Sequence, residues 1–302
     1  MGIGKYIKEI GRGREGARAL SREQANDLFG QVLDGEVTDL EIGAFCLAMR
    51  IKGETADEMA GFLDATHARL NRVPASNGKP VIVIPSYNGA RKLPVLTPLL
   101  ALLLAREGLP VLVHGTATES TRVYTSKVLS ALGIHAQSAI HAIAGGEVVF
   151  TPTAVLSPGL QRLLDVRRVV NLRNSAHSVV KLMNPCVGKS LLISSYTHPE
   201  YALSMAATFE LMQINAMLLR GTEGESVADA RRMPQMDAFI RGQRALLQEA
   251  KSGTLPSLPD LPKEFNADAT ATYIRSVMAG TSPVPPSIAK QVEHILLLSQ
   301  QL

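Results

Sequence analysis

The spacing of apolar residues changes partway along the chain. Up to about residue 70, apolar positions recur every three or four residues, which is typical of helices that bury one face. The pattern predicts four short helices, over residues 3–11, 22–34, 38–50 and 55–70. We therefore expect the first part of the chain to form a small helical domain.

Residues with known preferences for helix ends flank these segments. Ser21 and Thr38 stand where an N-cap hydroxyl is expected, and Thr55 and Glu58 have the spacing of a capping box. Glycine, which is favoured just after a helix, follows two of the segments, at Gly35 and Gly53. The local signals therefore agree with the apolar pattern.

After a polar linker at residues 72–80, short continuous apolar runs alternate with helical patterns, which favours a parallel sheet. We expect strands over 81–84, 111–113, 148–151, 168–172, 190–194 and 215–219. Helices are expected over 119–132, 158–164, 199–213 and 234–250, and proline-rich turns at 255–262 and 280–286 bracket two final helices. The expected fold is α/β, with a helical domain over 1–72 and a larger domain with a mainly parallel central sheet over 73–302. The helical domain can also be completed by a helix that comes from the sequence of the larger domain.

Composition and length restrict the class of protein. The 302 residues are 46% hydrophobic, which is enough for a large core and argues against extensive disorder. Cys46 and Cys186 lie far apart in sequence, which argues against a zinc site and a disulfide framework and fits a reducing cytoplasm. The longest apolar run, residues 93–105, contains two prolines and is too short to span a bilayer. We expect a cytoplasmic protein with no membrane partner.

Charge is distributed unevenly along the chain. The net charge is +4, yet residues 85–190 contain eleven basic residues and four acidic ones. Segregated positive charge points to a polyanionic partner, and a solvated basic face is the alternative. Both interpretations stay open on charge alone.

Two loops follow the first two predicted strands, at residues 85–89 and 114–118. Loops that lead from a parallel strand into a helix ordinarily bind phosphate, because unpaired N–H groups gather at the start of the helix. The first loop has one glycine, where a phosphate cradle would use several. Basic residues crowd around both loops, at Arg91, Lys92, Arg122 and Lys127.

The order of the elements and the spacing of these loops resemble the anthranilate phosphoribosyltransferase family, which shares its architecture with the nucleoside phosphorylases. The resemblance runs from about residue 21 to the end of the chain. It is carried by residues 44–63, the two loops, residues 172–177 with Asn184 and Pro185, and residues 219–225.

The diphosphate loop of those enzymes carries over only in part. Their glycine-rich GTGGD motif falls on residues 85–89, where Pro85 removes an amide donor and Tyr87 replaces a glycine. Their KHGN segment falls on residues 113–116, which keep His114 and Gly115 but lose the lysine and the asparagine. The hydroxyl-rich loop that follows keeps its hydroxyls and gains a carboxylate at Glu119.

The other functional positions also differ. Of the carboxylate pair that holds magnesium, Glu225 remains and Ser226 stands beside it, whereas the arginine that contacts the aromatic substrate is retained as Arg173. A single carboxylate holds magnesium poorly, so we expect no anthranilate phosphoribosyltransferase activity and assign no catalytic residue, metal or cofactor. A residual phosphate pocket is expected at Ser86, Tyr87, Asn88, Gly89, His114, Gly115, Thr116, Thr118, Ser120 and Thr121.

The altered motifs at residues 86–92 and 220–225 are similar to those of the YbiB-like branch of this family. That branch is associated with nucleic-acid binding and is dimeric through its helical domain. The resemblance implies a homodimer that binds DNA or RNA through phosphate contacts, with little sequence preference. The candidate nucleic-acid-binding residues are Arg91, Lys92, Arg122, Lys127, Arg167, Arg168, Arg173 and Lys181.

Two residues of the loops allow two interpretations each. Tyr87 either stacks on a base, as aromatic side chains do in single-strand binders, or fills the vacated diphosphate site. His114 lies at a strand end and is interpreted as a loop anchor, with a catalytic acid as the alternative.

The basic residues between positions 167 and 181 also allow more than one interpretation. Arg167 and Arg168 are expected just before a strand, so that their side chains point to opposite faces. If residues 173–181 are helical, His177 and Lys181 form a phosphate-binding ridge with Arg173; the alternative is a structural histidine and a solvated lysine.

A different class of function is the main alternative. The cleft would then belong to a glycosyl or phosphoribosyl transferase, or a phosphorylase, that acts on another small substrate. The hydroxyl-rich loop, Arg173, His114 and Glu225 support it. A dimeric scaffold without a ligand is the third hypothesis.

Overall fold

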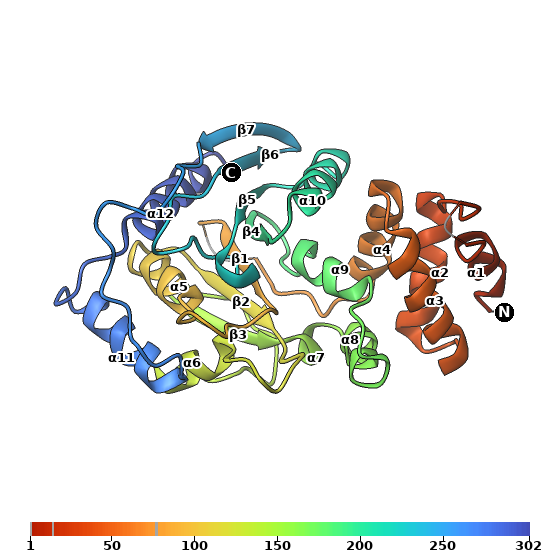
Figure 1. The fold of residues 1–302 in the computed structure, drawn as a ribbon, viewed down its shortest axis with the longest axis horizontal. Coiled ribbons are helices and arrows are strands. Elements are labelled where there is room, and N and C mark those ends of the chain that lie inside the picture. Colours follow the sequence, from red (N-terminus) through yellow and green to blue (C-terminus); the bar gives the residue numbers. More distant parts are fainter. Residues whose placement is uncertain (1, 14, 76–77) are drawn as a thin grey trace. The chain divides into compact units, whose positions relative to one another are not determined.

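The computed structural model describes residues 2–13, 15–75 and 78–302, which form two compact units (Figure 1). The helical unit comprises residues 1–71 and 153–185, and the α/β unit comprises residues 72–152 and 186–302. None of the helices within the described ranges is both long and apolar enough to cross a membrane.

The helical unit is held together by an aromatic core. Phe29 and Phe62 stack with their ring centroids 4.6 Å apart, and Phe45 meets both rings edge-on. Such aromatic pairs add to the stabilisation that burial itself provides. The helices of this unit are α1 (Gly4–Ile10), α2 (Arg22–Asp34), α3 (Asp39–Lys52), α4 (Ala56–His67), α7 (Thr153–Leu156), α8 (Pro158–Val170) and α9 (Ala176–Leu182).

The helix ends agree with the sequence prediction. Ser21, Thr38 and Thr55 each cap a helix through a complete capping box, in which the side chain three residues later bonds back to the cap backbone. Gly35 ends α2 in the left-handed conformation, at a φ of 77° that costs glycine little. Gly53 ends α3.

The α/β unit contains a seven-stranded sheet in the order β3-β2-β1-β4-β5-β6-β7. The first five of these are parallel, and β6 and β7 add an antiparallel hairpin. The strands are β1 (Val81–Ser86), β2 (Val111–Gly115), β3 (Val148–Pro152), β4 (Ser190–Tyr196), β5 (Ala216–Arg220), β6 (Met236–Ile240) and β7 (Gln243–Gln248). The mainly parallel α/β architecture predicted from the sequence is confirmed.

Helices cover this sheet. They are α5 (Thr97–Arg106), α6 (Thr125–Ala131), α10 (Pro199–Leu211), α11 (Ala267–Met278) and α12 (Pro286–Ser299), with a short 3₁₀ turn η1 (Thr222–Gly224). Every residue of β1 and β2 is buried, as expected for parallel strands covered on both faces. The pairing of Ser86 with Gly115 places the ends of β1 and β2 side by side. The loops that follow these strands therefore begin at the same edge of the sheet.

Two predicted elements were wrong, and a third is shorter than predicted. Residues 168–170 end helix α8, and Asn171 follows with a φ of 58°, so no strand spans 168–172. Arg167 and Arg168 consequently lie in the last turn of a helix and do not alternate across a strand. The helix predicted over 234–250 is the β6–β7 hairpin, and the helix predicted over 119–132 is confined to α6 because the residues before it form a loop.

Candidate functional site

Two loops and one turn meet at the ends of β1 and β2. In the structure the first loop extends over residues 85–92 and the second loop over residues 116–124, and these bounds replace the ones expected from the sequence. The turn segment is residues 221–228, after β5. Ala90 and Val123 join the two loops through a pair of backbone hydrogen bonds of 2.9 and 3.0 Å. The residues predicted to form a phosphate pocket are therefore brought together around this meeting point.

The carboxylate of Glu225 occupies the centre of the first loop. Its Oε1 accepts hydrogen bonds of 2.8 Å from the backbone N–H groups of both Asn88 and Gly89. Its Oε2 accepts from three hydroxyls, those of Ser86, Thr97 (3.1 Å) and Thr125 (3.3 Å). Only 1% of Glu225 is exposed, so the five donors replace the water that would otherwise solvate this charge.

A second carboxylate holds the end of the same loop. Oε2 of Glu223 accepts from the N–H groups of Arg91 (3.0 Å) and Lys92 (3.2 Å). Glu223 adopts a φ of 50°, and Gly224 follows at 87°. A Cβ at Gly224 would stand 1.7 Å from Nδ2 of Asn88, so glycine is required there.

Tyr87 of the first loop and His114 at the end of β2 form a buried pair. The hydroxyl of Tyr87 and Nδ1 of His114 are 2.8 Å apart, and the two rings meet at 70°. Both side chains are buried, and burial lowers the pKa of His114 to about 3. Tyr87 therefore fills the interior of the site and is not an exposed surface for base stacking, and neutral His114 anchors its strand end.

The second loop is closed by a side chain of its own. The Tyr124 hydroxyl accepts hydrogen bonds from the N–H groups of Thr118 (3.0 Å) and Glu119 (2.7 Å). Ser120 and Thr121 are exposed at the tip, and Thr116 is partly exposed. The amides of Thr118 and Glu119, which could otherwise donate to a phosphate, therefore already have an acceptor.

The four basic candidates in the α/β unit divide into two kinds. The Arg122 side chain is 9% exposed, pairs with Glu119 at 2.8 Å, and donates through Nη1 to the carbonyl of Asn88 at 3.0 Å. The side chains of Arg91, Lys92 and Lys127 are exposed and form no ion pair with any residue in the described ranges. Arg122 thus builds the loops, and the other three face solvent.

The remaining basic candidates belong to the helical unit. Arg168 is exposed and pairs with Asp165 at 3.2 Å, whereas Arg167, Arg173 and Lys181 are partly buried. Helix α9 contains His177 and Lys181, and Arg173 lies before its first turn. Burial, together with the positive charges of Arg173, Arg167 and Arg50, lowers the pKa of His177 to about 3. This histidine is therefore neutral and adds no charge to the cluster.

The groups around Glu225 do not fit a magnesium ion. Magnesium requires oxygen lone pairs directed at the metal, yet here N–H and O–H groups converge on the carboxylate and use both of its oxygens. Within the described part of the chain, no three His, Cys, Asp or Glu side chains gather as a metal site. Glu225 serves as an acceptor within the protein instead.

Sequence reasoning missed the partners that close the loops. Glu225 was identified as the remnant of a metal-binding pair, and Glu223, Tyr124, Thr97 and Thr125 were not assigned a role. Thr97 and Thr125 lie 128 and 100 positions from Glu225, so no local spacing in the sequence indicates these contacts. The one local signal is Gly224 between two glutamates, which indicates a turn with a constrained backbone.

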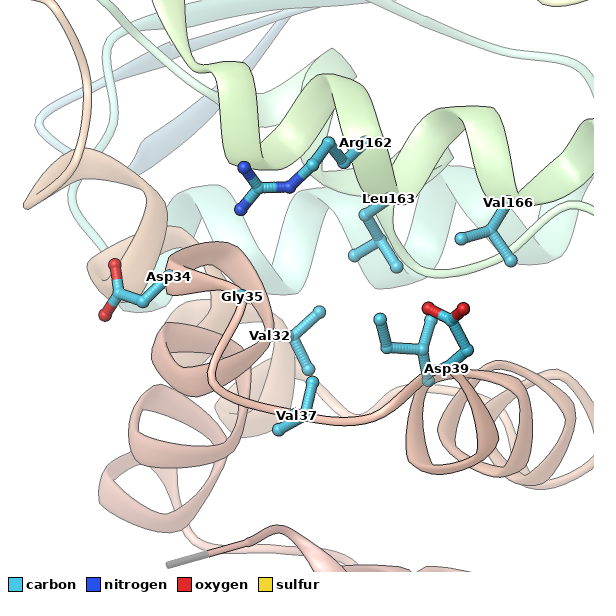
Figure 2. A pocket seen from close by; sticks show the side chains of 9 residues that line it. Val32, Asp34, Gly35, Val37, Asp39, Arg162, Leu163 and Val166 are labelled. Carbon is cyan, nitrogen blue, oxygen red and sulfur yellow. The ribbon is translucent and has the colours of Figure 1, made fainter.

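A separate hollow lies within the helical unit, between the end of α2, the start of α3, and α8 (Figure 2). Its volume is about 420 Å³, and it contains none of the predicted site residues. Arg162 donates to the carbonyl of Leu33 at 2.8 Å, and Asp34 pairs with Arg69 at 2.6 Å. Arg162 and Asp34 are thus already satisfied, and we assign no ligand to the hollow.

Comparison with known proteins supports the fold and the relationship. Residues 5–69 match the family described as glycosyl transferase family, helical bundle domain. The chain is 41% identical to the protein YbiB of Escherichia coli, over 98% of the chain and 94% of YbiB. An anthranilate phosphoribosyltransferase of Beijerinckia indica is also 41% identical, but over only 38% of the chain and 34% of that enzyme.

Solved structures agree on the architecture. The anthranilate phosphoribosyltransferase of Thermus thermophilus superimposes with a TM-score of 0.71, at 21% identity, over 95% of this chain and 85% of that enzyme. The corresponding enzyme of Saccharomyces cerevisiae, in complex with PRPP and Mg, gives a TM-score of 0.68 at 14% identity, over 99% of this chain and 88% of that enzyme. Similarity at this level shows that the fold is shared.

Proposed function

The chain belongs to the family of the Escherichia coli protein YbiB, and on that premise we propose that it binds DNA or RNA through phosphate contacts and does not transfer phosphoribosyl groups. Binding shows little sequence preference, because arginine and lysine side chains that contact phosphates do not read bases. Two features support this function: the resemblance of the loop motifs to the YbiB-like branch, and the hydrogen bonds that the loop amides already make within the protein.

The observation that carries the proposal is the occupancy of the loop amides. The N–H groups of Asn88 and Gly89 bind Glu225, and those of Thr118 and Glu119 bind Tyr124. A diphosphate bound by a phosphoribosyltransferase needs such amides as donors, since they stabilise the departing charge. With these donors already bonded, the loops support a surface role better than a catalytic one.

Exposed cations beside the closed loops support polyanion binding. Arg91, Lys92 and Lys127 face solvent in the α/β unit. The helical unit offers a second group, in which Arg168 is exposed and Arg167, Arg173 and Lys181 are partly buried. Contacts of this kind derive their free energy largely from counterion release, so affinity depends strongly on salt.

The helical unit also supports the proposed homodimer. Leu40, Leu47 and Ile51 lie on one face of α3 and are 83%, 48% and 61% exposed, with Ala44 between them at helical spacing. Apolar rows of this kind favour burial against a partner, and a two-fold axis would bring the same row of a second copy against it. Two copies would present two sets of basic residues, which raises avidity on long strands.

Fluorescence anisotropy of labelled oligonucleotides tests the proposal. We expect single-stranded or duplex oligonucleotides to bind at low salt, more tightly as their length increases, and to dissociate steeply as salt rises. Phosphoribosyl diphosphate with magnesium should not displace them beyond the effect of its ionic strength. Absent binding, or displacement by a low concentration of that small molecule, would instead favour a transferase or phosphorylase.

A further inference from the structure

The hydrogen bonds at Glu225 form a complete oxyanion-binding site. Two consecutive backbone amides, those of Asn88 and Gly89, point at one carboxylate oxygen, and consecutive amides of this kind form a concave anion site. The hydroxyls of Thr97 and Thr125 point at the other oxygen. Thr97 is the first residue of α5, so the positive end of a ten-residue helix also faces the carboxylate.

The turn segment is built to deliver this carboxylate. The N–H of Thr222 donates to the carbonyl of Val227 at 2.9 Å, which closes the turn. Gln291 of α12 fixes its far side, because its amide group bonds to the N–H of Ala228 at 2.8 Å and to the carbonyl of Ser226 at 3.0 Å. Glu225 is therefore held in place from both sides of the turn before any contact with the first loop is counted.

Close packing leaves no room for a side chain at two glycines of the turn. A Cβ at Gly221 would lie 1.8 Å from the carbonyl oxygen of Glu225, and a Cβ at Gly224 would collide with Asn88. The Ser226 hydroxyl adds a hydrogen bond of 3.0 Å to the carbonyl of Pro85. The turn and the first loop thus fit each other at several consecutive residues.

We infer that Glu225 is an internal ligand: its carboxylate occupies a small-oxyanion site in the first loop and excludes external anions from it. The site takes carboxylates of the size of acetate, because acetate contains the same heavy atoms that Glu225 carries beyond its Cβ. This inference concerns the interior of the α/β unit and holds whether or not the protein binds nucleic acid.

Removal of the internal ligand tests the inference by chemical rescue. Glu225→Ala in the full chain vacates the space of one acetate and leaves the five donors without an acceptor, so its midpoint of thermal unfolding should fall. Sodium acetate should raise that midpoint by several degrees over sodium chloride at the same ionic strength, since a ligand that binds only the folded state stabilises it. The wild type should show no difference between the two salts.

A matched destabilised variant separates binding from general salt effects. Ile84→Ala leaves an apolar cavity in β1 and exposes no hydrogen-bond donor, because Ile84 is fully buried. We expect acetate and chloride to act equally on it. An equal response of Glu225→Ala to both salts, or a response to acetate in Ile84→Ala as well, would overturn the inference.

Hydrogen exchange of the wild-type protein provides a test that does not depend on the folding of any variant. The N–H groups of Asn88 and Gly89 lie in a loop, yet the inference predicts that they exchange as slowly as the amides of β1. Exchange at the rate of an exposed loop would show that Glu225 does not occupy the site in solution, and would overturn the inference.

Discussion

Glu119 holds Arg122 across the first loop: the Nε–Oε2 distance is 2.8 Å, and the guanidinium also donates to the carbonyls of Asn88 and Gly89. The arginine therefore joins the two loops, with 9% of its side chain exposed. Arg91 and Lys92 follow Gly89 by two and three positions, and their side chains are exposed. Neighbouring basic residues consequently have different roles.

The first prediction separates these roles by stability. Arg122→Ala should lower the free energy of unfolding by about 2 kcal/mol, because it leaves two carbonyls and the Glu119 carboxylate without their donor. Arg91→Ala and Lys92→Ala should each change it by less than about 0.5 kcal/mol, as is usual for exposed side chains. Urea denaturation measures all three. Equal effects of the three substitutions would contradict the assignment.

The second prediction concerns Glu223, which holds the amides of Arg91 and Lys92. Glu223→Ala removes a negative charge beside two basic side chains, and charge alone predicts tighter binding of an oligonucleotide. We expect weaker binding instead, because the freed loop must be ordered again in the complex. Glu249→Ala, which removes an exposed carboxylate elsewhere in the same unit, is the control. If both variants bind more tightly by the same factor, Glu223 does not position the loop.

The third prediction is a loss of stability in mild acid. The folded-state pKa of His114 is about 3, against an ordinary value of 6.5, so the unfolded chain binds a proton between these values and the folded protein does not. Stability is then complete above about pH 6.5 and decreases as pH falls toward 3, by about 1 kcal/mol per pH unit for each such histidine. His177 adds a second contribution of the same sign, since its pKa is also lowered to about 3.

His114→Asn tests this assignment, because asparagine places a polar atom near the position of Nδ1 and does not titrate in this range. Its unfolding free energy should depend less steeply on pH between 6 and 4 than that of the wild type. Identical slopes for the two proteins in urea denaturation would show that His114 is not buried in its neutral form.

The fourth prediction concerns the proposed dimer. Leu47→Glu and Ile51→Glu together place two charges in the exposed apolar row of α3, and burial of two charges without partners is costly. We expect sedimentation to show a monomer with unchanged helical content. Leu258→Glu, at a residue that is 55% exposed in the α/β unit, should leave the dimer intact. A double variant that sediments like the wild type would exclude this face as the interface.

The sequence predicted what depends on local patterns. The N-cap at Thr38, the capping box at Thr55, and the buried runs of β1 and β2 are determined by residues that are close in sequence, and all of them are confirmed. The parallel order of the sheet followed from the alternation of strands and helices.

The errors have physical causes. The apolar run after Arg168 looked like a strand, but Ser157 caps α8 from eleven residues earlier and the helix continues until Asn171 reverses the backbone. The segment over 234–250 lacks a clear helical period, and pairing of β6 with β5 decides its conformation. The internal position of the Glu225 carboxylate depends on contacts with residues 100 to 139 positions away, which sequence spacing does not encode.

The most direct test of the proposed function measures oligonucleotide affinity against salt for two triple variants of equal charge. One carries Arg91→Glu, Lys92→Glu and Lys127→Glu; the other carries Arg241→Glu, Lys251→Glu and Lys263→Glu, which change exposed residues elsewhere in the same unit. Loss of about three phosphate contacts should weaken oligonucleotide binding by the first variant tenfold or more at low salt. The slope of log affinity against log salt concentration should become shallower by about two to three. The second variant should bind more nearly like the wild type. Equal affinities and slopes for the two variants would contradict a binding surface beside the closed loops.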